Sequence, residues 1–371
     1  MKSVILAAGK SENLYPLTVG RQKESLIIMG KPLIYYSLKG LSNYSSEIVV
    51  VVREGDESVS SSIREKGMTP KTVTQKGEGI EGAILSAKSI IDDNFILAFG
   101  DIIAESDFYR RIAFSHENGK VTISLIPVSK GINTYGIAFI DESGKPIKVM
   151  EKPKEFDEMS SLALGGLYIL QYDVFDFLEG GGSFIDYINK KIKEEGVNSF
   201  IWDGKWVDIG YPEDFLRALS LFLNNENSVI SSRAEVSSKS SIGKGVVIDD
   251  DAIIDDYSVI KGPAYIGKGA LIGAHSLIRG FSSIEEKAIV GAYCEVSSSF
   301  VMKGAKLFSK SYASYSVIGE NAMVGEGSIV MSYVDKVENI RLEEEKRKVT
   351  VINHRAKTEP YSVIKPGSIV I

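Results

Sequence analysis

Two lysines near a loop of small residues could bind phosphate groups. The apolar run at residues 3–7 continues into Ala8, Gly9 and Lys10, and Lys23 lies a short way downstream. Backbone N–H groups of a loop after a first strand can cradle phosphates, and a lysine can neutralise their charge. The pattern therefore indicates a phosphate site, although a buried strand end without a ligand would show the same residues.

Two aspartates could hold a metal ion. Asp101 follows the apolar run at residues 94–99, and Asp208 lies ahead of a helix that Pro212 is expected to open. A carboxylate just past the carboxyl end of a strand is where an open α/β sheet presents a ligand to a cation. Each could equally be an ordinary turn or helix-capping aspartate, so both interpretations stay open at this point.

The elements that must position these residues alternate between strands and helices over residues 1–225. Apolar runs rich in Val and Ile alternate with amphipathic helical patterns. The runs are residues 3–7, 47–52, 94–99 and 121–127, and the helical patterns are residues 32–41, 81–91 and 215–223. This alternation predicts a mostly parallel, Rossmann-like α/β sheet covered by helices on both faces. Ligands of such sheets gather at the carboxyl ends of the strands.

A period of six residues follows residue 230. Aliphatic side chains recur at every sixth position, with a mostly small residue two positions earlier. These positions are Ile242, Ile248, Ile254, Ile260, Ile266, Ile272, Ile278, Ile284, Val290, Val296 and Met302. A parallel β-helix explains the pattern, because each flat face of a coil points one aliphatic side chain inward and small residues let the chain turn at the corners. The hexapeptide form resembles left-handed β-helices, which are exceptions to the usual right-handed crossover rule.

The end of this repeat is less regular. The phase continues to Phe308, fails at Ser314 and resumes at Ile318, which predicts a short extrusion between coils. Residues 334–348 are highly charged and are expected to form a solvated helix or hairpin rather than a coil, and residues 361–371 could form a final partial turn. The polar, Ser-rich stretch at residues 224–239 predicts a boundary between an α/β domain at residues 1–228 and a β-helix at residues 229–371.

The loop after the first strand resembles the opening signature of sugar-1-phosphate nucleotidyltransferases, LAAGxGTRLxPLT followed by PK and GKPLI. The matching residues are Leu6, Ala7, Ala8, Gly9, Leu14, Pro16, Leu17, Thr18, Lys23, Gly30, Lys31 and Pro32. The family binds a nucleoside triphosphate there, so the resemblance implies nucleotide contacts from residues 6–10 and a triphosphate-facing role for Lys23. Ser11, Glu12, Asn13 and Gln22 depart from the signature, and Asn13 replaces the arginine that clamps the triphosphate. Lys10 lies nearby, but a lysine does not reproduce the bidentate fork of an arginine.

Later motifs follow in the family's order. Gln75 and Gly79 resemble the segment that reads the nucleobase, and the glutamine hints at a pyrimidine nucleotide. Asp101 occupies the place of the family's GD motif. WVDIGYPEDF resembles the WxDxGTPED motif with Asp208 as its metal ligand. The resemblance implies that Asp101 and Asp208 hold Mg²⁺.

The expected sugar site comes from two further motifs. Gly136, in TYGIAF, and Glu151 with Lys152, in VMEKPK, resemble the family's YG and EKP. There the glycine and the glutamate contact the sugar, and the lysine contacts its phosphate. Leu164 stands in place of the family's sugar-binding asparagine.

The implied reaction is attack of a sugar-1-phosphate oxygen on the α-phosphorus of an NTP, with pyrophosphate leaving in line. The protein contributes positioning and charge neutralisation and needs no nucleophile of its own. The alternative is a catalytically weakened paralogue that binds nucleotide or nucleotide sugar as a regulatory or scaffolding subunit. The metal, lysine and sugar-site matches favour the enzyme, whereas the departures at residues 11–13, Ile80 and Leu164 favour the alternative.

The second domain resembles the hexapeptide half of bifunctional enzymes that also acetylate an amino sugar. Those enzymes use a histidine as general base where this chain has Ser309, and Ser332 replaces the asparagine expected downstream. His275 lies within the repeats and is interpreted as a coil residue rather than a displaced base. We therefore predict no acetyl transfer and expect an oligomerisation module. It would form either a homo-oligomer with trimer-type contacts or a hetero-oligomer with a catalytic paralogue.

Composition limits the remaining classes. The chain has 371 residues, of which 44% are hydrophobic and 25% charged, and its net charge is −6. These values exclude a disordered chain, and the acidic balance argues against nucleic-acid binding. We find no membrane span and no signal peptide in the sequence. The single cysteine, Cys294, cannot form an internal disulfide, which predicts a cytoplasmic protein.

Overall fold

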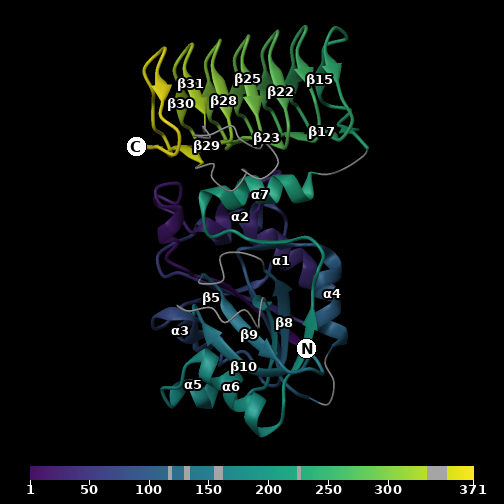
Figure 1. The fold of residues 1–371 in the computed structure, drawn as a ribbon, viewed down its shortest axis with the longest axis vertical. Helices are drawn as coiled ribbons and strands as arrows, with labels where there is room; N and C mark the ends of the chain where they lie inside the picture. Colours follow the sequence, from purple (N-terminus) through teal and green to yellow (C-terminus); the bar gives the residue numbers. More distant parts are fainter. Residues whose placement is uncertain (116–118, 129–133, 154–161, 224–226, 332–348) are drawn as a thin grey trace. The chain divides into compact units, whose positions relative to one another are not determined.

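The computed structural model describes residues 1–115, 119–128, 134–153, 162–223, 227–331 and 349–371 (Figure 1). The chain separates into two compact units. The first contains residues 1–10, 21–25 and 32–206, and the second contains residues 11–20, 26–31 and 207–371. The domain boundary predicted at residue 228 stays a prediction, and the charged segment at residues 334–348 lies outside the described residues.

A mixed sheet forms the centre of the first unit. Its main path runs in the order β10-β9-β11-β6-β1-β4-β5, and β8 pairs with both β11 and β12. The strands are β1 (Lys2–Ala7), β4 (Ile48–Val52), β5 (Lys71–Thr74), β6 (Phe95–Phe99), β8 (Thr122–Pro127), β9 (Gly136–Ile140), β10 (Pro146–Glu151), β11 (Leu162–Leu170) and β12 (Asn198–Ile201). Strands β6, β1, β4 and β5 are mutually parallel, and β11 runs antiparallel to β6. The carboxyl ends of these four parallel strands therefore lie along one edge of the Rossmann-like half of the sheet.

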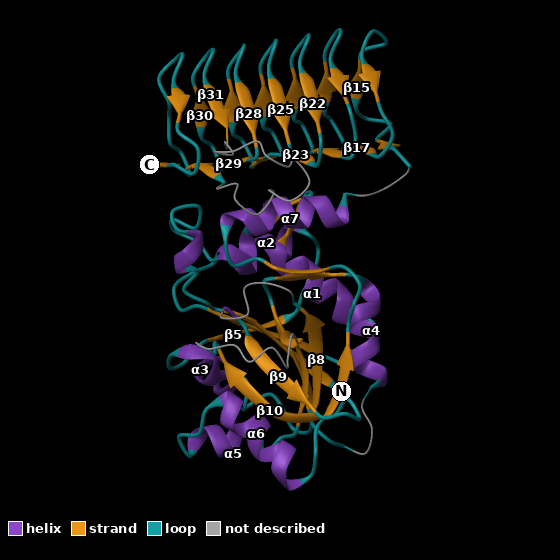
Figure 2. Ribbon diagram, viewed as in Figure 1, coloured by secondary structure: helices purple, strands orange, loops and turns teal. Residues whose placement is uncertain are grey.

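Helices cover both faces of this sheet, as predicted (Figure 2). Alternate residues of one strand face opposite cores: Ile5 packs with one buried cluster, and Val4 with the other. The helices of this unit are α1 (Leu33–Leu41), α2 (Ser58–Glu65), α3 (Gly79–Ser86), α4 (Ser106–Phe114), α5 (Val174–Glu179) and α6 (Phe184–Glu194). Strands buried on both sides carry continuous apolar runs, which is why the pattern of Ile48–Val52 shows no polar alternation.

Several short elements complete residues 1–208. They are the 3-10 turns η1 (Glu12–Leu14) and η2 (Lys23–Ser25), and the strands β2 (Ile27–Ile28), β3 (Lys31–Pro32), β7 (Ile102–Ala104) and β13 (Trp206–Asp208). No helix among the described residues is long and apolar enough to span a membrane.

The second unit contains the predicted left-handed parallel β-helix, in which three parallel sheets receive one strand per coil in turn. The first sheet contains β14 (Val229–Ile230), β17 (Val246–Ile248), β20 (Ala264–Ile266), β23 (Ser282–Ile284), β26 (Phe300–Val301), β29 (Ser316–Ile318), β32 (Thr350–Ile352) and β34 (Ile369–Val370). The second contains β15 (Glu235–Val236), β18 (Ile253–Ile254), β21 (Leu271–Ile272), β24 (Ile289–Val290), β27 (Lys306–Leu307) and β30 (Met323–Val324). The third contains β16 (Ser241–Ile242), β19 (Val259–Ile260), β22 (Leu277–Arg279), β25 (Glu295–Ser297), β28 (Tyr312–Ser314), β31 (Ile329–Met331) and β33 (Val363–Ile364). The coils thus begin before the regular hexapeptide pattern, and residues 361–371 do form closing strands.

The prediction of which residues point into the interior of the late coils was wrong. Ile266 stacks on Ile284 at an 18-residue step, but Ile284 stacks on Val301 and Val301 on Ile318 at steps of 17. One corner is therefore a residue shorter in each of two coils, after Val296 and after Ala313, and no extrusion occurs there.

The interior positions of these coils are accordingly Val301, Leu307 and Ala313, which are fully buried, whereas Phe308 is 45% exposed. Met302 is buried but does not occupy the stacking position. A coil can lose a residue at a corner because the flat faces, not the corners, fix the hydrogen-bond register.

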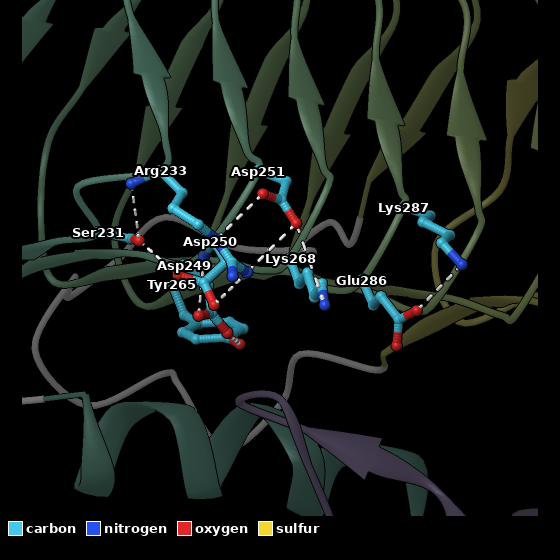
Figure 3. A network of polar contacts seen from close by, with 9 residues as sticks. All are labelled: Ser231, Arg233, Asp249, Asp250, Asp251, Tyr265, Lys268, Glu286 and Lys287. Carbon is cyan, nitrogen blue, oxygen red and sulfur yellow. Dashed lines mark hydrogen bonds and ion pairs between the residues drawn. The ribbon is translucent and has the colours of Figure 1, made fainter. Parts of the chain in front are cut away.

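Charges alternate along one column of the β-helix surface. The column lies two residues after each buried aliphatic residue of the first sheet and contains Asp250, Lys268, Glu286, Lys303 and Glu320. Figure 3 shows its first members within a wider network, in which Arg233 binds Asp250 at 2.6 Å. Lys303 binds Glu286 at 3.1 Å. Exposed pairs of this kind contribute little free energy.

Two further elements pack on the β-helix within this unit. Helix α7 (Pro212–Phe222) places Phe215 against Phe300, with ring centroids 4.9 Å apart. The segment at residues 26–31 is held by Glu285, a completely buried carboxylate that accepts the backbone N–H groups of Met29 and Gly30 at 2.7 and 2.9 Å.

Candidate active site

The loop after β1 begins the candidate site. Its carbonyl groups are held from neighbouring segments: the Gln22 amide donates to the Ala7 carbonyl, and the Arg53 guanidinium donates to the Gly9 carbonyl. Gln22 is fully buried, and its Oε1 accepts a hydrogen bond from the backbone N–H of Arg53 at 3.3 Å. Gln22, where the family signature has proline, thus fixes the shape of the loop.

Arg53 is a cation that sequence reasoning missed. It follows β4 directly, and β4 lies parallel to β1, so its side chain reaches the loop from the same sheet edge. The signal was present in the sequence, because a charged residue directly after the apolar run Ile48–Val52 is the type of residue expected at a carboxyl edge.

Lys23 and Asp101 form an ion pair at the centre of this edge. The Lys23 Nζ lies 2.5 Å from the Asp101 Oδ2, and their side chains are only 14% and 16% exposed. Lys23 lies on η2, and Asp101 follows β6 at the turn before β7. The structure therefore brings the predicted triphosphate-facing lysine and a predicted metal ligand together.

Glu24 is a second carboxylate beside this pair, which sequence reasoning also missed. It is 2% exposed, and burial raises its pKa to about 7; Lys23 opposes this shift and Asp101 adds to it. The Glu24 Oε2 and the Asp101 Oδ1 are both buried and have no hydrogen-bond partner among the residues that the structure describes. No sequence pattern marked Glu24, because a glutamate beside a lysine usually indicates solvent exposure.

The predicted nucleobase residues lie in the loop between β5 and α3. The Gln75 amide donates to the carbonyls of Gly77 and Gly79 at 3.0 and 3.1 Å, so it shapes this loop from within. Gly79 has a φ of +71°, a conformation that glycine adopts without steric cost. The Lys10 Nζ lies 4.0 Å from a carboxylate oxygen of Glu78, at the end of the same loop.

The predicted sugar residues are adjacent in the sheet. Gly136 pairs directly with Glu151 in the β9–β10 ladder, and the Lys152 N–H donates to the Tyr135 carbonyl at 3.0 Å. A Cβ at Gly136 would lie 2.9 Å from the Leu164 side chain and 3.1 Å from the Glu151 Oε2. Gly136 is therefore needed for close packing, and Leu164 occupies the space beside it.

Register places these residues at the same sheet edge as the phosphate loop. Because β11 is antiparallel to β6, with Leu167 opposite Ala98, residues 162–164 of β11 extend beyond the carboxyl end of β6. There Ala163 pairs with Ile137, next to Gly136. The first unit thus gathers the predicted phosphate, nucleobase and sugar residues at one edge of its sheet.

The remaining predicted residues belong to the second unit. Asp208 ends β13 and is half-buried. Ser11, where the family signature has glycine, has a left-handed backbone with φ of 58° and ψ of 32°. The position thus has the conformation that a glycine would adopt most easily. Among the described residues, no group of three or more His, Cys, Asp or Glu side chains could hold a metal ion.

Two of the residues considered for acetyl transfer, Ser309 and His275, lie at corners of the β-helix. Ser309 precedes a left-handed corner residue, Lys310, after β27. The ring of His275 is stacked between Tyr257 and Tyr293, with centroids 5.0 and 4.8 Å away. His275 is thus part of an exposed aromatic column, while Ser332 lies outside the described residues.

Comparisons with known proteins agree with this geometry. Residues 2–225 match the family "Nucleotidyl transferase", and residues 260–370 match "GMPPB C-terminal domain". The chain is 32% identical to the Bifunctional protein GlmU of Methanococcus maripaludis, over 100% of this chain and 87% of that protein. It is 31% identical to a bifunctional sugar-1-phosphate nucleotidylyltransferase/acetyltransferase of Sulfurisphaera tokodaii, over 96% and 86%.

A solved structure from Bacillus anthracis, named as a glucose-1-phosphate thymidylyltransferase in complex with a sucrose, is also similar. Its TM-score is 0.52 at 26% identity, and the match covers 59% of this chain and 93% of that one. The family match, the full-length relatives and the shared fold agree, and this chain therefore belongs to the nucleotidyl transferase family.

Proposed function

We propose that this protein is an enzyme that transfers a nucleotidyl group from an NTP to a sugar-1-phosphate and releases pyrophosphate. The observation that carries the proposal is the largely buried Lys23–Asp101 pair. It lies at the sheet edge that also carries the phosphate loop and the Gly136–Glu151 pair. In this reaction a sugar-phosphate oxygen bonds to the α-phosphorus while the bond to pyrophosphate breaks. The protein's contribution is alignment and charge neutralisation.

We assign the side chains by chemistry. Lys23 neutralises the triphosphate, backbone groups of Leu6, Ala7, Ala8 and Gly9 with Lys10 surround it, and Gln75 with Gly79 shapes the base loop. Glu151 contacts the sugar beside Gly136, and Lys152, whose side chain is 62% exposed, receives the sugar phosphate.

Arg53 provides the guanidinium that position 13 lacks. Its side chain reaches the Gly9 carbonyl, and a guanidinium has further N–H groups with which to bind a phosphate. Asn13, by contrast, is exposed on η1. Arg53→Gln should lower kcat/KM by on the order of 10² to 10³, by analogy with other lost donors, and Arg53→Lys should recover only part of the loss.

Nucleotidyltransferases of this kind generally depend on a divalent metal, and we propose Mg²⁺ held by Asp101 and Asp208. The unpartnered, buried Asp101 Oδ1 fits such an ion. When bound, Mg²⁺ supplies positive charge for the phosphates. Asp101 and Lys23 help to align the same phosphate groups.

The decisive experiment is pyrophosphate release across a panel of NTPs and sugar-1-phosphates with Mg²⁺. Activity should exceed that of Asp101→Ala, and the exposed-site control Asp107→Asn should match the wild type. If no combination exceeds the Asp101→Ala variant, the alternative of a weakened regulatory or scaffolding paralogue is favoured. The same alternative is favoured if activity appears only in a variant that combines Ser11→Gly, Glu12→Thr and Asn13→Arg.

We further propose that the β-helix does not transfer acetyl groups, because Ser309 replaces the expected base and His275 is a stacked corner residue. Release of free CoA from acetyl-CoA and an amino-sugar phosphate would contradict this. The β-helix instead serves assembly, as a homo-oligomer with trimer-type contacts or with a catalytic paralogue. Light scattering and co-purification distinguish the two forms. The cytoplasmic location predicted from the single cysteine stays part of the proposal.

A further inference from the structure

Glu24 has no role in the nucleotidyl transfer proposed above, yet its carboxylate lies inside the site. Its Cγ is 3.3 Å from the position that a Cβ on Gly100 would occupy, directly before Asp101. Its Oε1 is 4.0 Å from the corresponding position on Gly9. The carboxylate therefore lies between the end of the phosphate loop and the turn that carries Asp101.

Two carboxylates of this region each have an oxygen without a partner in the described part of the chain. These oxygens are the buried Glu24 Oε2 and Asp101 Oδ1, while Lys23 binds the other Asp101 oxygen. A buried polar atom without a partner costs free energy, and an unpaired buried charge costs more. Fixed unpaired oxygens on neighbouring carboxylates are suitable ligands for a small divalent cation, which takes oxygen ligands and often binds through one or two carboxylates.

We propose that Glu24 and Asp101 together form a divalent-cation site that is occupied before any nucleotide binds, with Lys23 competing with the cation for Asp101. The role of the cation in catalysis rests on the proposed function. The binding step itself needs neither nucleotide nor sugar phosphate. Glu24 thereby becomes a metal-binding residue that the family signature does not include.

Mn²⁺ is the probe, because its free concentration can be followed by electron paramagnetic resonance. The full chain is titrated with Mn²⁺ at pH 8 without nucleotide. The wild type should bind one Mn²⁺, and Glu24→Gln and Asp101→Asn should each weaken binding at least tenfold. Lys23→Gln should tighten binding, since it removes the competing ammonium. Glu65→Gln, on an exposed residue at the end of α2, should bind as the wild type does.

Two results would overturn the proposal: a wild type without a stoichiometric Mn²⁺ site, or a folded Glu24→Gln variant with unchanged affinity. Circular dichroism shows whether each variant is folded. If Glu24→Gln does not fold, Lys23→Gln decides, because weaker or unchanged binding in that variant contradicts competition for Asp101. Mn²⁺ binding without pyrophosphate release would leave this inference standing and reject the proposed function. If the protein releases pyrophosphate but Glu24→Gln binds Mn²⁺ as the wild type does, the proposed function stands and this inference is rejected.

Discussion

Replacing Glu285 with glutamine tests how the segment at residues 26–31 is held on the β-helix. Glu285 is fully buried and accepts hydrogen bonds from the N–H groups of Met29 and Gly30 and from the Ser283 hydroxyl. Both Met29 and Gly30 have positive φ values, 49° and 71°. A Cβ on Gly30 would lie 2.2 Å from the Tyr265 hydroxyl oxygen, so this backbone fits closely. The carboxylate is thus the main polar support of a closely packed turn.

The size of the effect follows from the chemistry of the amide. Glutamine keeps one acceptor oxygen but turns an N–H₂ group toward one of the two backbone donors. Loss of a hydrogen bond to a charged acceptor costs about 1.5–3 kcal/mol, and each 1.4 kcal/mol is a factor of ten in an equilibrium constant. We therefore expect at least one of the two amides to exchange about tenfold to a hundredfold faster with solvent.

Native-state hydrogen exchange measures this directly, because it reports the local opening of each amide. The matched control is Glu286→Gln at the next residue, whose partners Lys303 and Lys287 lie on the surface. That change should alter exchange at Met29 and Gly30 less than twofold. Unchanged exchange in Glu285→Gln, or an equal acceleration in both variants, would refute the reasoning.

Two further predictions concern α7. Asp214 accepts the N–H groups of Gly210 and Tyr211, and burial raises its pKa to about 6 from 3.8. The folded carboxyl then holds its proton more tightly than the unfolded one, so the free energy of unfolding should fall by up to about 3 kcal/mol between pH 4 and 6. Urea midpoints across this range should lose that slope in Asp214→Asn, and an identical slope would contradict the assignment. Phe215→Ala should cost about 3–5 kcal/mol in urea unfolding, because its ring is fully buried against Phe300; the exposed Tyr257→Ala should cost far less.

By itself the sequence determined the architecture, because both halves carry strong periodic signals. Continuous apolar runs such as Ile48–Val52 require a strand buried on both faces, and aliphatic residues at every sixth position require stacked coils. Motif order along the chain also indicated the candidate residues, and strand register then brought Lys23, Asp101 and the Gly136–Glu151 pair to one sheet edge.

Only the tertiary structure decided the details that depend on residues far apart in the sequence. The shortened corners could not be predicted, because Met302 and Val301 are both aliphatic and only hydrogen-bond register selects one of them. The environments of Glu24 and Arg53 depend on which strand ends meet at the phosphate loop, and neither residue belongs to a periodic pattern. A sequence shows which residue types are available, but burial and the absence of partners arise only when the chain has folded around them.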